Sequence, residues 1–194
     1  MMAIWFKRTR LWWHAGLMAL LLTACASPQR IGSDVGTDAF ERTGRFALNV
    51  QNFGGKRDAV QGGFAWHDDG RKLTLDLSNP LGNTLARVDV APGQATLTRS
   101  SGEQERAGHP DALVELVLGS PMPVAGLRDW LRGKTGDARI DGLQKNEDGQ
   151  ITAFSQDGWR VQLSRYDAAG PRLLQLHRGD PNRDISLRLV IDGD

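Results

Sequence analysis

Residues 45–51, Arg-Phe-Ala-Leu-Asn-Val-Gln, alternate apolar and polar side chains with the two-residue period of a β-strand. The alternation places Phe46, Leu48 and Val50 on one face and mostly polar residues on the other. We therefore expect one face of this strand to be buried against a core and the other to meet water, as is usual in antiparallel sheets.

The same period recurs downstream in two groups of segments, separated by turn signals that are spaced as in antiparallel meanders. In the first group the apolar residues that share a face are Val60, Phe64 and Trp66, followed by Leu73, Leu75 and Leu77. The second group lies near the C-terminus and consists of residues 151–156, 159–166, 172–178 and 185–191.

Between the two groups the pattern changes to that of short helices. Residues 110–118 have Pro and Asp in the first turn and Gly119 just past the end. Residues 123–132 place Leu127, Trp130 and Leu131 on one face. The predicted fold class is α+β, a single curved antiparallel sheet of many strands with two or three helices covering one face.

The N-terminus has the parts of a secretory leader, followed at once by the only cysteine of the chain. A basic segment precedes the apolar run 15–22, which is far shorter than the ~20 residues needed to cross a bilayer. We therefore expect residues 1–24 to be a cleaved signal peptide. Leu22-Thr23-Ala24-Cys25 resembles the bacterial lipobox, which makes Cys25 the predicted site of lipid attachment. The alternative is an ordinary signal peptide with a chance cysteine near its end.

The composition after the leader indicates one exported domain. Residues 25–42 are rich in turn formers and are predicted to be a lipidated tether, and residues 43–194 to be a single compact domain. The chain has a formal net charge of +1, and the leader holds three basic and no acidic residues, so the mature part carries −2. This balance disfavours a nucleic-acid-binding protein. Because Cys25 has no partner in the chain, no internal disulfide is expected.

Residues capable of catalysis are sparse and scattered. His67, His109 and His177 occur singly and without metal-binding spacing, and no nucleophile-elbow or phosphate-binding motif is present. The acidic pairs Asp68-Asp69 and Glu147-Asp148 lie beside glycine and are interpreted as solvated turns. We expect no enzyme activity, metal or cofactor.

The aromatic residues admit two interpretations. Trp66, Trp130 and Trp159 lie in different elements, where they either fill a solid core or line an apolar pocket, and periodicity does not separate these alternatives. If a pocket exists, its predicted lining is the set of large apolar residues on inward faces: Phe46, Phe64, Trp66, Leu75, Trp130 and Trp159.

Asn79-Pro80-Leu81-Gly82 matches a type I turn position by position. Leu81 falls near the tip, where a polar residue is the usual choice. Two alternatives follow: the leucine folds back onto the protein, or it is displayed to contact something apolar.

The chain also resembles a known family, the outer-membrane lipoprotein receptors called LolB, from about residue 44 to residue 191. The resemblance rests on the order and spacing of several short motifs: Gly44-Arg45-Phe46-Ala47, Gly63-Phe64-Ala65-Trp66, Leu77-Ser78-Asn79-Pro80-Leu81-Gly82-Asn83-Thr84, Gly119-Ser120-Pro121-Met122-Pro123, Leu127-Arg128-Asp129-Trp130-Leu131 and Gly158-Trp159 followed by Val161. It implies a half-barrel whose apolar cavity accepts the acyl chains of lipoproteins from a periplasmic, LolA-like carrier. It also implies that the exposed leucine of a protruding loop, here Leu81 between Pro80 and Gly82, places lipoproteins in the membrane.

The predicted function is therefore that of a monomeric, lipid-anchored receptor at the outer membrane, facing the periplasm, with the carrier, acylated lipoproteins and the bilayer as partners. Ala26 follows the cysteine, and an Asp at that position commonly retains a lipoprotein in the inner membrane. Two alternatives stand against this function. One is a scaffolding lipoprotein with a solid core that binds only proteins, and the other, disfavoured by the missing nucleophile motif, is a lipid esterase.

Overall fold

The computed structural model describes residues 39–193, which form one antiparallel sheet of 11 strands and two α-helices. The predicted signal peptide and Cys25 lie outside the described residues. The elements, in chain order, are β1 (Phe40–Asn52), β2 (Arg57–Asp68), β3 (Leu73–Ser78), β4 (Thr84–Ala91), β5 (Gln94–Arg99), β6 (Gln104–Ala107), α1 (Pro110–Leu118), α2 (Val124–Trp130), β7 (Ile140–Lys145), β8 (Ile151–Gln156), β9 (Trp159–Asp167), β10 (Gly170–Asp180) and β11 (Arg183–Ile191).

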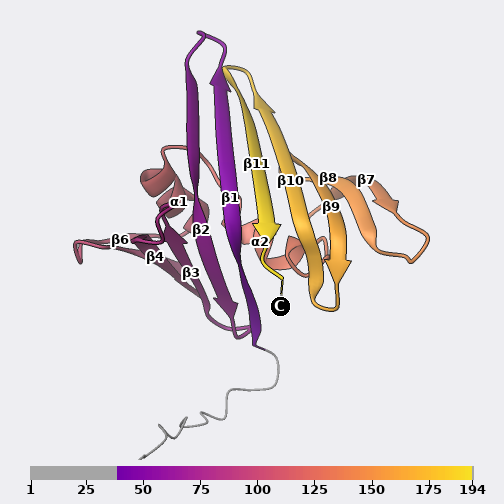
Figure 1. Cartoon of the computed structure of the whole chain (residues 1–194), viewed down its shortest axis with the longest axis horizontal. Helices are drawn as coiled ribbons and strands as arrows, with labels where there is room; N and C mark the ends of the chain where they lie inside the picture. The colour runs from indigo at the N-terminus through magenta and orange to yellow at the C-terminus, as the bar shows by residue number, and fades with distance from the viewer. Residues whose placement is uncertain (1–38, 194) are drawn as a thin grey trace, which may run out of the picture. The chain divides into compact units, whose positions relative to one another are not determined.

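Two meanders meet at the centre of the sheet. The strand order is β6-β5-β4-β3-β2-β1-β11-β10-β9-β8-β7, so the first and last strands are neighbours. The pairing of β1 with β11 runs from Gly44 opposite Ile191 to Asn52 opposite Arg183. The two helices carry the chain from β6, at one edge, to β7, at the other. Figure 1 shows the resulting curved, unclosed sheet with both helices on its inner side.

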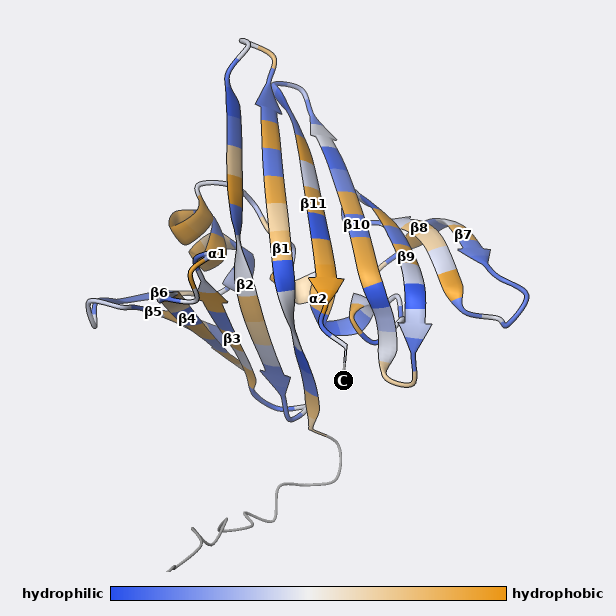
Figure 2. Ribbon diagram, viewed as in Figure 1, coloured by the Kyte–Doolittle hydropathy of each residue, from blue (hydrophilic) through white to orange (hydrophobic). Residues whose placement is uncertain are grey.

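The predicted alternation is confirmed. Phe46, Leu48 and Val50 are buried on the inner face, together with Phe64 and Trp66 of β2. Figure 2 shows the same pattern as alternating hydrophobic and hydrophilic bands along β1, β10 and β11. The curved antiparallel sheet agrees with the predicted fold class.

α2 and the first strand differ from the prediction at their ends, whereas α1 does not. α1 has the predicted bounds, with Gly119 in the left-handed region (φ 70°) donating its N–H to the carbonyl of Glu115. α2 is shorter than the predicted 123–132, and no third helix occurs within residues 39–193. β1 begins at Phe40, so residues 40–42 of the predicted tether belong to the sheet. None of the helices in this range is long and apolar enough to span a membrane.

Two glycines on the inner face make room for aromatic rings of the neighbouring strand. Gly44 pairs with Phe64, and Phe46 pairs with Gly62. A Cβ built on Gly62 would lie 2.9 Å from the Phe46 ring, and one built on Gly44 would lie 3.0 Å from the Phe64 ring. A Cβ at Gly44 would also clash with the Val190 carbonyl oxygen, and one at Gly62 with the Ser78 carbonyl oxygen, so neither position has room for a side chain.

One end of the sheet, where β1 begins and β2 and β9 end, is closed by charged pairs; we call it the base. Arg42 of β1 donates two hydrogen bonds of 2.7 Å to the carboxylate of Asp167, at the end of β9. β11 and β10 lie between these strands in the sheet, but β11 ends at Ile191, opposite Gly44. Arg42 lies beyond that end and spans the gap. Its bidentate contact holds the pKa of Asp167 well below the usual range.

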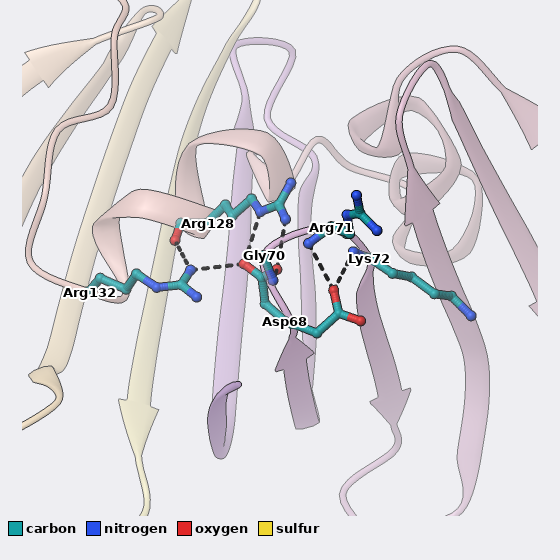
Figure 3. Close-up of polar contacts among 7 residues, drawn as sticks. Asp68, Gly70, Arg71, Lys72, Arg128 and Arg132 are labelled. Carbon is teal, nitrogen blue, oxygen red and sulfur yellow. Dashed lines mark hydrogen bonds and ion pairs between the residues drawn. The ribbon is translucent and has the colours of Figure 1, made fainter. Parts of the chain in front are cut away.

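The prediction that Asp68-Asp69 is a solvated turn is wrong for Asp68, which is buried. Only Asp69 is exposed, and its carboxylate accepts the N–H groups of Arg71 and Lys72. Asp68 ends β2 on the inner face with 1% of its side chain exposed. It accepts hydrogen bonds of 2.7 and 2.9 Å from Arg128 and of 2.8 Å from Arg132. Figure 3 shows both guanidinium groups converging on this carboxylate. The C-terminal end of α2 is thereby fixed to β2.

Asp68 remains ionised at low pH. Burial opposes its charge, but hydrogen bonds from Arg128, Arg132 and the Gly70 N–H outweigh that effect and lower its pKa to about 2. An aspartate in an unfolded chain has a pKa of about 3.9. Ionised Asp68 therefore stabilises the fold above that pH, and the contribution is lost as the pH falls towards 2.

We predict that Asp68→Asn lowers the free energy of unfolding at pH 7 by about 3 kcal/mol, because two guanidinium groups lose their buried counter-charge. Between pH 5 and pH 3 the stability of the variant should fall less steeply than that of the unsubstituted protein. Urea denaturation at several pH values measures both effects. Asp69→Asn is the matched control, because its exposed amide oxygen still accepts the turn N–H groups. Equal effects of the two substitutions would contradict the role of Asp68.

Candidate functional site

A small apolar void lies between α2 and the inner face of the sheet. Its volume is about 10 Å³, room for roughly one water molecule. The sheet, the α1–α2 connection and α2 with the residue after it all contribute to the lining, which consists of Phe64, Trp66, Leu75, Leu189, Met122, Leu127 and Leu131.

α2 covers this void because of how its residues are spaced. Leu127 and Leu131, four residues apart, share the helix face that packs on the sheet, and Trp130 beside them is fully buried. At the other end of the helix, the Ala125 N–H donates to Asp111 of α1 at 3.0 Å. The short helix is thus held by its apolar face, by Arg128 and by one hydrogen bond to α1.

The predicted pocket residues separate into two groups. Phe64, Trp66 and Leu75 line the void. Phe46, Trp130 and Trp159 are buried in the core without bordering it. The Trp130 ring meets Phe154 edge-on at 5.9 Å, and the Arg178 guanidinium lies over Trp159 at 6.0 Å.

Several residues of this region were not identified from the sequence as site residues. Met122 and Leu189 carry no signal that distinguishes them from other core residues. The sequence pattern places Leu127 and Leu131 on one face of a helix, but it does not show that this face covers a void. The sequence does not identify Arg128 and Arg132 as partners of Asp68, because they lie 60 and 64 residues away along the chain.

The loop between β3 and β4 forms the predicted type I turn. The Gly82 N–H donates to the Asn79 carbonyl at 2.9 Å, and the Asn79 side-chain oxygen accepts the N–H groups of Leu81 and Asn83. Gly82 has φ 86°, and the Asn79 N–H returns to the Asn83 carbonyl. The turn therefore closes with a glycine bulge, a standard hairpin connection.

Leu81 is displayed at the tip of this turn. Its exposed fraction is 86%, the highest among the exposed large hydrophobic residues of the described chain, which also include Phe53, Leu116 and Leu143. Of the two alternatives, the structure selects display over packing against the body of the protein.

The same backbone turn occurs at three other hairpins, closed by Asn52 and Lys56, by Arg99 and Glu103, and by Asn146 and Gln150. The residues that stand where Leu81 stands are Gly54, Ser101 and Asp148. The turn therefore does not require a leucine there.

The described residues offer no site for metal chemistry. No group of three metal-ligating side chains occurs within residues 39–193. His67, His109 and His177 are exposed, and His67 pairs with Glu41 at 2.8 Å.

Larger depressions lie away from both helices. One of about 390 Å³, on the outer face of the sheet, has Arg160, His177 and Arg188 among its lining residues. An acyl chain placed there would lie beside charged groups, whereas every residue that lines the void beneath α2 is apolar. The void beneath α2 is the better candidate for an apolar ligand.

Residues 38–193 match the family LolB, described as outer membrane lipoprotein LolB. The outer-membrane lipoprotein LolB of Bordetella parapertussis is 55% identical over 184 residues, which cover 93% of this chain and 92% of that protein. The LolB of Cupriavidus necator is 40% identical over 179 residues, covering 89% and 90%.

Among solved structures, a LolA superfamily protein of Nitrosomonas europaea superposes with a TM-score of 0.44 and 6% identity, over 79% of this chain and 87% of that one. At this TM-score the superposition does not contribute to the assignment, which rests on the sequence matches. With a family match over most of its length and relatives of this similarity, the chain belongs to the LolB family of outer-membrane lipoproteins, which are lipoprotein-sorting receptors and not enzymes.

Proposed function

We propose that this protein accepts the acyl chains of lipoproteins in the space beneath α2 and releases them into the outer membrane. The observation that carries the proposal is the apolar void between a short helix and a curved sheet, lined by Phe64, Trp66, Leu75 and Leu127 among others. The void is too small for an acyl chain. Uptake therefore requires α2 to move away from the sheet, with the chain replacing the packing that is lost.

The free energy of exposing acyl chains to water explains why a lipoprotein needs a protein cavity during transfer. Three acyl chains of ordinary length, at ~0.8 kcal/mol per CH₂, would cost on the order of 30 kcal/mol to expose to water. A protein cavity removes that cost during transfer. Movement down a series of acceptors needs no nucleotide hydrolysis when each acceptor binds the lipid more tightly than its donor.

Leu81 supports a separate role in delivery. Burying one leucine in the headgroup boundary gains ~2 kcal/mol, which is too little to anchor a protein but enough to bias its orientation at a bilayer. Ser101 and Asp148 stand at the matching positions of two other turns, so the turn itself does not require a leucine, and this supports the proposed contact of Leu81 outside the turn.

The remaining parts of the proposal concern location and partners. Cys25 carries the lipid anchor, residues 26–39 link it to β1, and the domain faces the periplasm as a monomer. A LolA-like carrier hands over acylated lipoproteins, and the outer-membrane bilayer receives them. The rival function is a scaffolding lipoprotein that binds only proteins, and the tight packing beneath α2 is the observation in its favour.

Binding of an apolar fluorescent probe separates these two functions. We predict saturable binding that is displaced by acyl compounds. Leu127→Ala should lower the free energy of unfolding by about 2 to 4 kcal/mol and raise the affinity for the probe several-fold, because the void is larger before α2 moves. Leu116→Ala, at an exposed position of α1, is the matched control and should change neither quantity. Absence of saturable binding in all three proteins would favour the scaffold.

A second prediction concerns Leu81→Ser, which introduces the residue that stands at the same position, Ser101, in another turn of this conformation. Folding should change by less than about 0.5 kcal/mol, since the turn keeps Asn79, Pro80 and Gly82. Uptake from the carrier should persist, whereas release into liposomes should fall roughly tenfold or more. A two-step assay with a labelled lipoprotein measures uptake and release separately.

Adding Ser101→Leu to Leu81→Ser provides the positional control. The double variant restores the number of exposed leucines, and we expect it not to restore release. Equal loss in both steps, or a large drop in melting temperature for Leu81→Ser, would show that the leucine has no separate delivery role.

A third prediction concerns the anchor. Cys25→Ala should abolish acylation and leave the protein either unprocessed or, if another peptidase cuts it, soluble. Mass spectrometry and membrane fractionation check the two outcomes, with the unsubstituted protein expected in the outer membrane. Recovery of the unsubstituted protein from the inner membrane would contradict the proposed location.

A further inference from the structure

Trp66 has a buried polar group that the fold leaves without a partner. The residue is 2% exposed, and its indole Nε1 has no hydrogen-bond acceptor among residues 39–193. Trp130, equally buried, donates its indole N–H to the Gln156 side chain at 2.8 Å. Buried donors without acceptors are rare because they lose the hydrogen bond that water would make. The contrast between the two tryptophans therefore calls for an explanation specific to Trp66.

The surroundings of Trp66 point to a ligand as the missing acceptor. Its side chain lines the void beneath α2 together with Phe64 and Leu75. Two residues along β2 on the same inner face, Asp68 binds Arg128 and Arg132, whose side chains are 33% and 21% exposed. Trp66 thus lies between an entirely apolar space and a charged group that reaches solvent.

An acylated molecule changes character over the same short distance. Its hydrocarbon chain is apolar, and the ester or amide carbonyl at the head of the chain is a hydrogen-bond acceptor next to a polar group. An indole N–H only donates and a carbonyl oxygen only accepts, so the two groups are complementary.

We propose that the indole N–H of Trp66 donates a hydrogen bond to the ester or amide carbonyl of a bound acyl group. The hydrocarbon chain then extends beneath α2, and the polar end of the ligand lies towards Arg128 and Arg132. This inference rests on the proposed function and adds to it a residue that sets how deeply the chain enters. The buried, unpaired N–H acts as a recognition element for acyl groups as opposed to plain hydrocarbon.

A matched pair of ligands tests the hydrogen bond. 1-Lauroylglycerol carries an ester carbonyl, and 1-O-dodecylglycerol has the same chain length and headgroup with an ether in its place. Affinities for both are measured by calorimetry with the full chain, in which Cys25→Ala removes the lipid attachment site from every protein compared.

Trp66→Phe removes the N–H and keeps an aromatic ring at the void. Trp130→Phe is the matched control, because it removes an indole N–H that already has a partner, away from the void. We expect the parent protein to bind the ester about 3- to 10-fold more tightly than the ether. Trp66→Phe should bind the two equally, with its affinity for the ether nearly unchanged. Trp130→Phe should keep the preference for the ester.

The outcomes distinguish failure of this inference from failure of the proposed function. If both ligands bind but Trp66→Phe keeps the preference for the ester, or loses affinity for ester and ether alike, the hydrogen bond is overturned and the cavity stands. If neither ligand binds the parent protein, both proposals fall.

A measurement on the parent protein decides the question if Trp66→Phe does not fold. The ¹⁵N–¹H resonance of the Trp66 indole should move downfield when the ester binds and move much less with the ether. An equal response to both ligands would overturn the proposal.

Discussion

The pairing of β1 with β11 is the constraint on which the rest of the structure depends. It joins the first and last strands of the sheet, so two meanders that are local in sequence become one continuous inner face. Without it each meander would present an unpaired edge, β1 in the first and β11 in the second. The register is also decisive: Phe46 lies opposite Leu189 and Leu48 opposite Leu187, and all four are buried. A slip of one residue would turn one set of these side chains to the outer face.

The inner face created by this pairing is apolar and must be shielded from water. The two helices, which lie in the connection between the two meanders, cover it. α1 packs over β4, β5 and β6, and α2 lies over the centre of the sheet. The ion pairs of Asp68 fix one end of α2, while most of its remaining contacts are apolar. Apolar packing is not directional, so a hydrocarbon chain is able to replace it. The proposed uptake of an acyl chain depends on this difference between directional contacts at the base and non-directional contacts over the void.

The hairpin turns place few constraints on the residues at their tips. Four turns share one backbone conformation, with glycine at the position of positive φ, and their hydrogen bonds come mainly from the backbone and from Asn79 and Asn146. The tip residues are therefore free to vary without cost to the fold. Leu81 is one such tip residue, and its exposure adds nothing to the stability of the folded state, so the proposed delivery role places no demand on the fold.

The sequence by itself determined the local structure: the strands around Phe46 and Trp159, the bounds of α1, the turn at Asn79 and the family. These features depend on periodicity and on turn chemistry within a few residues. Only the tertiary structure decided that Asp68 is buried while Asp69 is solvated, that Leu81 is displayed, and that Trp66 borders the void while Trp130 lies away from it. Each of these outcomes depends on groups that are distant along the chain, such as Arg128 for Asp68 and Gln156 for Trp130. Period-two alternation assigns a side chain to a face but not to its partner, and burial, charge and ligand contact are all set by the partner.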